Sequence, residues 1–231
     1  MSDNGDKAFM EPWRSPVRRV AVVLMIGLLA SLGGCESIFR EKPVLRPMEY
    51  MLQTPYADVY TLAVAPAINL SGSRHVEPYD VADTLFNEMQ QVAGWNVLPL
   101  NKTLLAMRRL GIQTIDKPED VKNLAVLLGV NALVIPAVTA YDPYNPPTMG
   151  MILQMYETTG SSPVAQVNAV FNATNQSVLR ELRDFAQGRT QYDSAMLDQK
   201  FLMDADLYAR FVCHAMVRRL IEVERERLFD R

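Results

Sequence analysis

The sequence predicts an α/β (α+β) fold: a single mixed sheet with packed helices, parallel in its first half and an antiparallel meander in its second half, closed by a long C-terminal helix. Three observations predict it. Strand and helix patterns alternate from residue 58 to residue 129, which is typical of parallel strands joined by right-handed crossovers. Strand patterns then follow one another from residue 132 to residue 173, as in a meander. The last pattern is helical over about 25 residues.

The alternating half begins with a buried strand. Residues 58–66 (DVYTLAVAP) are rich in Val, Leu and Ala and end at a proline, which is typical of a strand covered on both faces. Residues 78–93 place apolar side chains on one face and polar side chains on the other. The clearest helix of the chain is therefore predicted there, ended by Gly94.

A short strand and two further helices complete this half. The strand is predicted over residues 95–99 (WNVLP). Asn101 is expected to cap the next helix, which Gly111 ends. Asp116 is expected to cap the helix after it, which Gly129 ends.

The second half is predicted as strands over residues 132–141, 149–156, 164–173 and 178–182. The third of these alternates apolar and polar side chains, which indicates a half-exposed antiparallel strand. Pro136 interrupts the first strand and favours an edge position or a bulge, because proline cannot donate to the ladder.

The closing helix, roughly residues 204–228, has an apolar face formed by Ala209, Val212, Cys213, Met216, Leu220 and Val223. Cys213 is expected to act as a small buried hydrophobe, since a reactive thiol needs an exposed, electropositive setting. The opposite side carries Arg210, His214, Arg218 and Arg225. It is predicted to be a solvated basic face, with docking of an acidic partner as the alternative.

The amino terminus is typical of a secretory signal. Three arginines precede a charge-free apolar run over residues 20–32. A run of about 13 residues is shorter than the roughly 20 that span a bilayer as a helix. The segment ends in Leu32, Gly33, Gly34 and Cys35.

These four residues resemble the bacterial lipobox, in which the cysteine thiol receives a diacylglycerol before cleavage on its amino side. The resemblance implies a lipoprotein signal peptide over residues 1–34 and a lipidated, palmitate-bearing Cys35. Three prolines and the lack of a sustained period predict a tether over residues 35–56, followed by a periplasmic α/β domain over residues 57–230. Residues 50–52 of the tether are expected to be able to dock on the domain. Translation is expected to start at Met1 or Met10.

Residue Glu36 follows the cysteine. In sorting of the enterobacterial type, an Asp at that position retains a lipoprotein in the inner membrane. Its absence predicts a periplasm-facing protein of the outer membrane, with the inner membrane as the alternative.

Composition argues against several classes of protein. With 49% hydrophobic residues the chain has ample material for a core, so it is not expected to be disordered. A net charge of −3 argues against nucleic-acid binding by a general positive field. Two Cys and two His cannot form a disulfide scaffold or a His-rich metal cage. No cofactor and no metal are expected.

The front half of the domain resembles a known group of periplasmic domains. Its first strand is followed by Pro66, Asn69 and Ser71, and residues 128–134 (LGVNALV) lead into the third strand. This pattern resembles the α/β domain shared by the curli-secretion lipoprotein, the penicillin-binding-protein activator lipoproteins, the TolB amino-terminal domain and neisserial lipoproteins. The resemblance covers about residues 61–140. It implies a role in envelope assembly or regulation and no catalytic residues.

The expected partner-binding loop contains Tyr141, Asp142, Tyr144 and Asn145. Neighbouring prolines stiffen it, which lowers the entropy lost on docking, and tyrosine supplies contact area with a polar tip. A rigid hairpin connection is the alternative.

Two other sets of residues have side chains that chemical sites use. Ser71 and His75 lie in one loop, but the sequence has no G-x-S-x-G elbow, so a partner-contacting loop is favoured over a hydrolase site. Met149, Met151 and Met155 could bind Cu(I) through their thioethers. No His or Cys stands beside them, so core packing is favoured.

The sequence therefore predicts a lipid-anchored, non-enzymatic envelope protein that acts through protein–protein contacts. Its expected partners are the membrane, through acylated Cys35, and other envelope proteins, with a homo-oligomer left open. One alternative is a ligand-binding or enzymatic domain, which a deep polar pocket at His75 or Asp142 would favour. A second is an oligomeric secretion-channel component, for which residues 149–173 supply the long strands.

Overall fold

The structure is a computed structural model that describes residues 52–53, 60–144, 146–158, 162–187, 189 and 194–229. The chain divides into two units, Met1–Pro43 and Val44–Arg231, and every described residue belongs to the second. The predicted signal peptide, the lipobox with Cys35, most of the tether, and Asn145 lie outside the described residues. The predicted boundaries at residues 34 and 56 therefore stay predictions.

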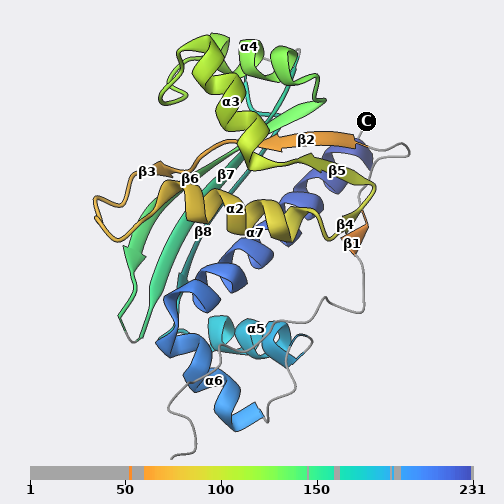
Figure 1. Cartoon of the computed structure of the whole chain (residues 1–231). Helices are drawn as coiled ribbons and strands as arrows, with labels where there is room; N and C mark the ends of the chain where they lie inside the picture. Colours follow the sequence, from red (N-terminus) through yellow and green to blue (C-terminus); the bar gives the residue numbers. More distant parts are fainter. Residues whose placement is uncertain are drawn as a thin grey trace, which may run out of the picture. The chain divides into compact units, whose positions relative to one another are not determined.

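A mixed sheet with strand order β5-β2-β6-β7-β8 organises the described residues, and short β3 pairs β6 beyond the end of β2 (Figure 1). The strands are β2 (Tyr60–Val64), β3 (Ile68–Asn69), β5 (Trp95–Leu98), β6 (Ala132–Asp142), β7 (Thr148–Glu157) and β8 (Ala165–Asn172). β2 pairs with β5 and β6 in parallel, whereas β6, β7 and β8 pair antiparallel. The predicted α/β fold, with its parallel and antiparallel halves, is confirmed.

Pro136 does not mark an edge, because β6 lies in the interior of the sheet. Its parallel partner changes at this point: β2 pairs up to Val134, and β3 resumes the pairing at Ala137. The proline thus occupies a break between two parallel partners, where the ladder is already interrupted. The bulge of β6 lies farther on, between Val138 and Ala140.

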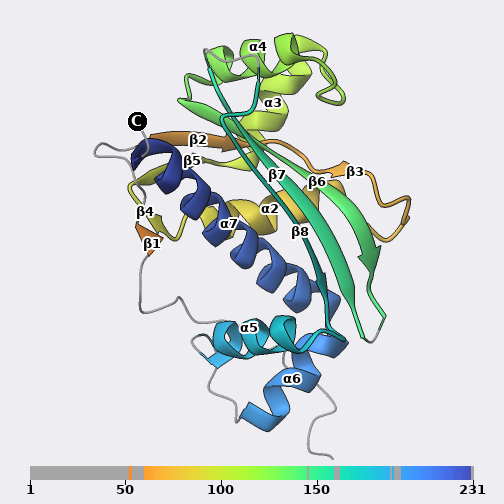
Figure 2. The same cartoon turned by 180° about the vertical axis from the view of Figure 1, so that it is seen from behind.

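Helices cover both faces of the sheet (Figures 1 and 2). They are α2 (Pro78–Met89), α3 (Leu100–Leu110), α4 (Pro118–Leu128), α5 (Gln176–Gln187), α6 (Ser194–Met203) and α7 (Ala205–Phe229). The predicted C-terminal helix is confirmed as α7. It packs against α2, β7 and β8, so one helix ties together the two halves of the sheet.

Two apolar clusters fill the two faces. The larger joins the inward side chains of β7 and β8 to α2, α5, α6 and α7, with Phe171, Phe201 and Phe211 among its fully buried members. The smaller lies beneath α3 and α4 around Ala63 and Leu133. α3 and α4 contact β2 and β6, so their layer leaves the outward side chains of β8 exposed.

Helices α3 and α4 end at the predicted glycines but do not begin at the predicted caps. Gly111 and Gly129 end α3 and α4 at φ values of 70° and 65°, as predicted. Neither Asn101 nor Asp116 caps a helix, because Pro99 and Lys117 hold those positions.

Helix α2 ends at Met89, before Gly94, because the chain turns into strand β4 (Val92–Ala93). β4 pairs in parallel with β1 (Leu52–Gln53). The expectation that Leu52 docks on the domain is thereby confirmed for that residue.

The strand predicted over residues 178–182 is wrong, since this segment lies in α5. Its buried side chains are Val178, Leu182, Phe185 and Ala186, a spacing that matches one face of a helix. The Asn175 side chain accepts hydrogen bonds from the Ser177 backbone N–H at 2.9 Å and hydroxyl at 2.8 Å. Asn175 thus caps the start of α5.

Candidate functional site

The loop between β3 and α2 is held in shape by its own side chains. The Asn69 side-chain oxygen accepts hydrogen bonds from the Ser71 backbone N–H at 3.1 Å and from the Ser71 hydroxyl at 2.8 Å. The Ser71 hydroxyl in turn accepts from the Ser73 N–H at 3.1 Å. Because its proton goes to Asn69, this hydroxyl serves the loop and is not activated by His75, as nucleophilic catalysis would require.

The β6–β7 hairpin is fixed in a similar way. The Asp142 carboxylate accepts a hydrogen bond from the Tyr144 backbone N–H at 3.0 Å. The Tyr144 side chain is 68% exposed, and its ring meets the His75 ring edge-on with 6.2 Å between centroids. The two loops selected from the sequence therefore meet. We call His75, Tyr141, Asp142 and Tyr144 the hairpin-tip surface.

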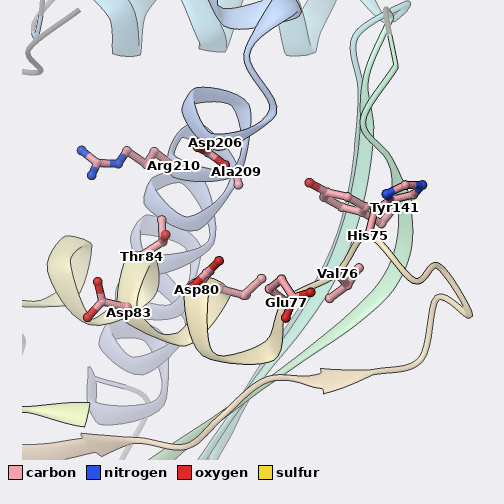
Figure 3. Close-up of a pocket in the computed structure, with 11 residues that line it drawn as sticks. His75, Val76, Glu77, Asp80, Asp83, Thr84, Tyr141, Asp206, Ala209 and Arg210 are labelled. Carbon is pink, nitrogen blue, oxygen red and sulfur yellow. The ribbon is translucent and has the colours of Figure 1, made fainter. Parts of the chain in front are cut away.

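A groove opens beside this surface, between α2 and the start of α7 (Figure 3). Its volume is about 330 Å³, and its lining includes the carboxylates of Glu77, Asp80, Asp83 and Asp206. Arg210 and His75 are the basic side chains in that lining. Four carboxylates against one guanidinium give the groove a negative potential, which favours cationic groups.

Tyr141 joins the hairpin-tip surface to the groove. Figure 3 shows its hydroxyl turned toward α7, where Asp206 and Ala209 lie. Burial raises the pKa of Tyr141, and the nearby Asp206 charge raises it further. The hydroxyl therefore stays protonated at neutral pH and can donate a hydrogen bond to a bound group.

A polar pocket at His75 or Asp142 is the feature that favours a ligand-binding domain, and the groove reaches one of these two residues. It reaches His75, but Asp142 does not line it. Its lining contains no Ser or Cys, the usual nucleophiles beside a histidine base. The chemistry it offers is recognition: carboxylates, a tyrosine hydroxyl and one exposed imidazole ring.

A buried ionic cluster was missed by the sequence prediction. Arg189, which follows α5, donates to both carboxylate oxygens of Glu88 on α2, each at 2.7 Å, and to the Gln91 side-chain oxygen at 2.7 Å. His214 Nδ1 lies 3.2 Å from the same carboxylate. Glu88, Arg189 and His214 are 3%, 2% and 5% exposed. The predicted solvated basic face is thus wrong at His214.

Burial of the Glu88 carboxyl raises its pKa, but hydrogen bonds from His214 and Arg189 outweigh burial, and the net pKa is lowered. The carboxylate stays ionised and ties α2, the end of α5 and α7 together. One signal in the sequence was available: Glu88 lies seven residues after Val81 and three after Leu85, on the apolar face of α2. A carboxylate on such a face needs a buried cation.

The remaining candidates lie in the core. Cys213 is free and fully buried, which raises its pKa. Met149, Met151 and Met155 are fully buried in the larger cluster. Within the described ranges, no group of three or more His, Cys, Asp or Glu is placed to hold a metal ion. No helix in that part of the chain is long and apolar enough to span a membrane.

No protein-family model and no curated protein matches the sequence. Among solved structures, the chain is similar to the LpoB C-terminal domain from Salmonella enterica, at 10% identity over 51% of this chain and 85% of that chain, with a TM-score of 0.43. It is similar to lipoprotein GNA1162 from Neisseria meningitidis, at 15% identity over 49% and 80%, with a TM-score of 0.42. It is also similar to a PelC dodecamer from Paraburkholderia phytofirmans, at 10% identity, covering 69% and 92%, with a TM-score of 0.35. At these scores the likeness is partial, and no function is carried over from these proteins.

Proposed function

We propose that this chain is a lipid-anchored, non-enzymatic protein of the cell envelope, held at the outer membrane on its periplasmic side, and that it acts through protein–protein contacts in envelope assembly or regulation. The observation that carries the proposal is the sequence Leu32, Gly33, Gly34 and Cys35 at the end of a short charge-free run. A basic start and a run too short to span a bilayer suit a cleaved signal.

Attachment would come from the lipid alone. Each acyl CH₂ that enters the bilayer contributes about 0.8 kcal/mol, and stable anchoring takes more than one chain. The net charge of −3 adds no attraction to anionic headgroups. Removal of the Cys35 thiol should therefore remove the acyl anchor.

Labelling of cells with a fatty-acid probe tests the anchor. The wild type should take up label and sediment with membranes. The Cys35→Ala variant should take up none. Equal labelling of the two would rule out acylation at Cys35.

The hairpin-tip surface is the proposed contact site. Tyr144 is exposed, and its ring contacts the His75 ring edge-on. The Asp142 side chain accepts a hydrogen bond from the Tyr144 backbone N–H and so fixes the hairpin backbone. An aromatic side chain that is already held in place loses little entropy on docking. Exposed tyrosines of this kind often dominate binding energy.

Crosslinking in the native envelope tests this role, with matched variants of the full chain. Tyr144→Ala should abolish capture of a specific envelope protein. Tyr79→Ala, which removes a ring 57% exposed against 68% for Tyr144, should preserve it. Equal capture by both variants would remove the hairpin-tip surface from the proposal.

The groove supports a second candidate, binding of a small cationic ligand. Its volume of about 330 Å³ and four carboxylates are the observation in favour. Titration of the full chain with spermidine, followed by calorimetry, separates the candidates. Saturable binding of spermidine to the wild type that is lost in Asp80→Asn would support a ligand site. If the wild type does not bind spermidine, the protein-contact role stands alone.

A further inference from the structure

Strand β8 forms one edge of the sheet (Figure 2). It pairs with β7 over its full length, from Ala165 opposite Met155 to Asn172 opposite Thr148. No strand among the described residues pairs with its other side. The backbone donors and acceptors of every second residue of β8 therefore face this edge without a strand partner.

Sheets normally protect such an edge with a charged side chain, a proline, a bulge or a very short strand. β8 reads AQVNAVFN, with no charge and no proline. Its pairing with β7 has no register shift. The opposite edge, β5, is four residues long, so it has the protection that β8 lacks.

The side chains of β8 divide cleanly between its two faces. Ala165, Val167 and Phe171 are buried, whereas Gln166, Asn168 and Val170 are exposed. Val170 is 60% exposed, and valine has a high preference for strands. The edge combines a high strand preference with an apolar side chain at its rim.

We infer that β8 is a homodimer interface: two copies pair antiparallel through this strand, so that one continuous sheet crosses both. A two-fold axis through the middle of the strand places Asn168 opposite its own copy and Gln166 opposite Val170. Side chains along a strand alternate between the two faces. This pairing therefore places the buried side chains of both copies on one face of the joint sheet and the exposed side chains of both copies on the other.

The absence of charge on β8 favours a second copy over a strongly charged partner. The whole chain carries −3, yet β8 has no ionisable group, and the residues of β7 opposite Asn168 and Gln166 are the half-buried, uncharged Ile152 and Gln154. Two copies meet here without the like-charge repulsion that opposes dimers of acidic proteins. A basic or acidic partner would find no complementary charge. This inference does not depend on the hairpin-tip surface.

Single cysteines in the full chain, kept in its native membrane, test the pairing. Gln166→Cys, Asn168→Cys and Val170→Cys are treated in turn with a short bis-maleimide. At least Asn168→Cys should yield a crosslinked dimer of this chain. Asn123→Cys, at an exposed asparagine of α4, should give only the wild-type background. Absence of dimer from all three positions, or crosslinks only to another protein, would overturn the inference.

A charge on the edge gives a second, independent test. Val170→Lys places two lysines in each interface and should raise the dimer dissociation constant on the order of tenfold. Val126→Lys changes an equally exposed valine, 61% against 60%, on α4 and should leave dimerisation unchanged. Thermal unfolding of both variants checks that they fold. Equal dimerisation of the two folded variants would contradict a β8 interface.

Discussion

The carboxylate of Glu88 contacts both the buried guanidinium of Arg189 and the buried imidazole of His214. Its removal should therefore lower the stability of the folded protein. In Glu88→Gln, the amide keeps one acceptor for Arg189 but supplies no charge. Arg189 would then stay buried at 2% exposure without the partner that it binds at 2.7 Å through two nitrogens.

The magnitude follows from burial. Removal of one partner from a buried ion pair costs roughly 3–5 kcal/mol, because the other charge is left uncompensated. For a domain of this size, each kcal/mol lowers Tm by about 2–4 °C. Glu88→Gln should therefore lower Tm by roughly 10 °C. The control is Glu181→Gln, whose partner Arg219 lies at 3.0 Å in a pair 36% and 31% exposed, and which should cost about 0–1 kcal/mol.

The assay is thermal and urea unfolding of the full chain in detergent at pH 7, followed by circular dichroism. A loss below about 1 kcal/mol, or equal losses in Glu88→Gln and Glu181→Gln, would refute the argument that the cluster holds α2, α5 and α7 together.

The same cluster predicts a pH dependence. The pKa of Glu88 in the folded protein lies below its ordinary value of 4.5. The unfolded state therefore binds the proton more readily, and the stabilisation is fully present above about pH 4.5. It is lost as the pH falls through the lower, folded pKa. The difference in unfolding free energy between wild type and Glu88→Gln should shrink over that acid range.

Three other predictions concern packing and local structure. Gly150→Ala should lower stability by about 1–3 kcal/mol, because a Cβ there would lie 2.7 Å from Thr139 Oγ1; partial rescue by Thr139→Ala would be measured by Tm, and an unchanged Tm for Gly150→Ala would contradict the clash. Cys213 should resist maleimide in the folded protein and react after denaturation, since burial raises its pKa; labelling as fast as that of an exposed Asn123→Cys would contradict the burial. Asn175→Ala should lose about 0.5–2 kcal/mol by removing the cap of α5, as urea unfolding would show, with an unchanged midpoint as the contrary result.

Patterns that lie within one element predicted most of the fold. Alternation along residues 164–173 placed Val167 and Phe171 inward, and the structure buries both. Left-handed glycines ended α3 and α4 where expected. These features depend on a few neighbouring residues, so the sequence shows them directly.

What the sequence did not show depends on partners far along the chain. His214 looked solvent-facing on its own helix, but its partner Glu88 lies 126 residues away. The window of residues 178–182 was too short to separate a strand from a helix, and the stripe that decides it continues to Phe185. The meeting of His75 with Tyr144 likewise arises from β3 and β6 pairing in the sheet.

The most direct test of the proposed function is site-specific photocrosslinking in the native envelope from a probe residue at Tyr144. The full chain with its intact Cys35 should form a discrete adduct with another envelope protein when the probe stands at Tyr144. The same probe at Tyr79, a ring of similar exposure on α2, should form none. No adduct from Tyr144, or the same adducts from both positions, would contradict a protein that works through contacts at the hairpin-tip surface.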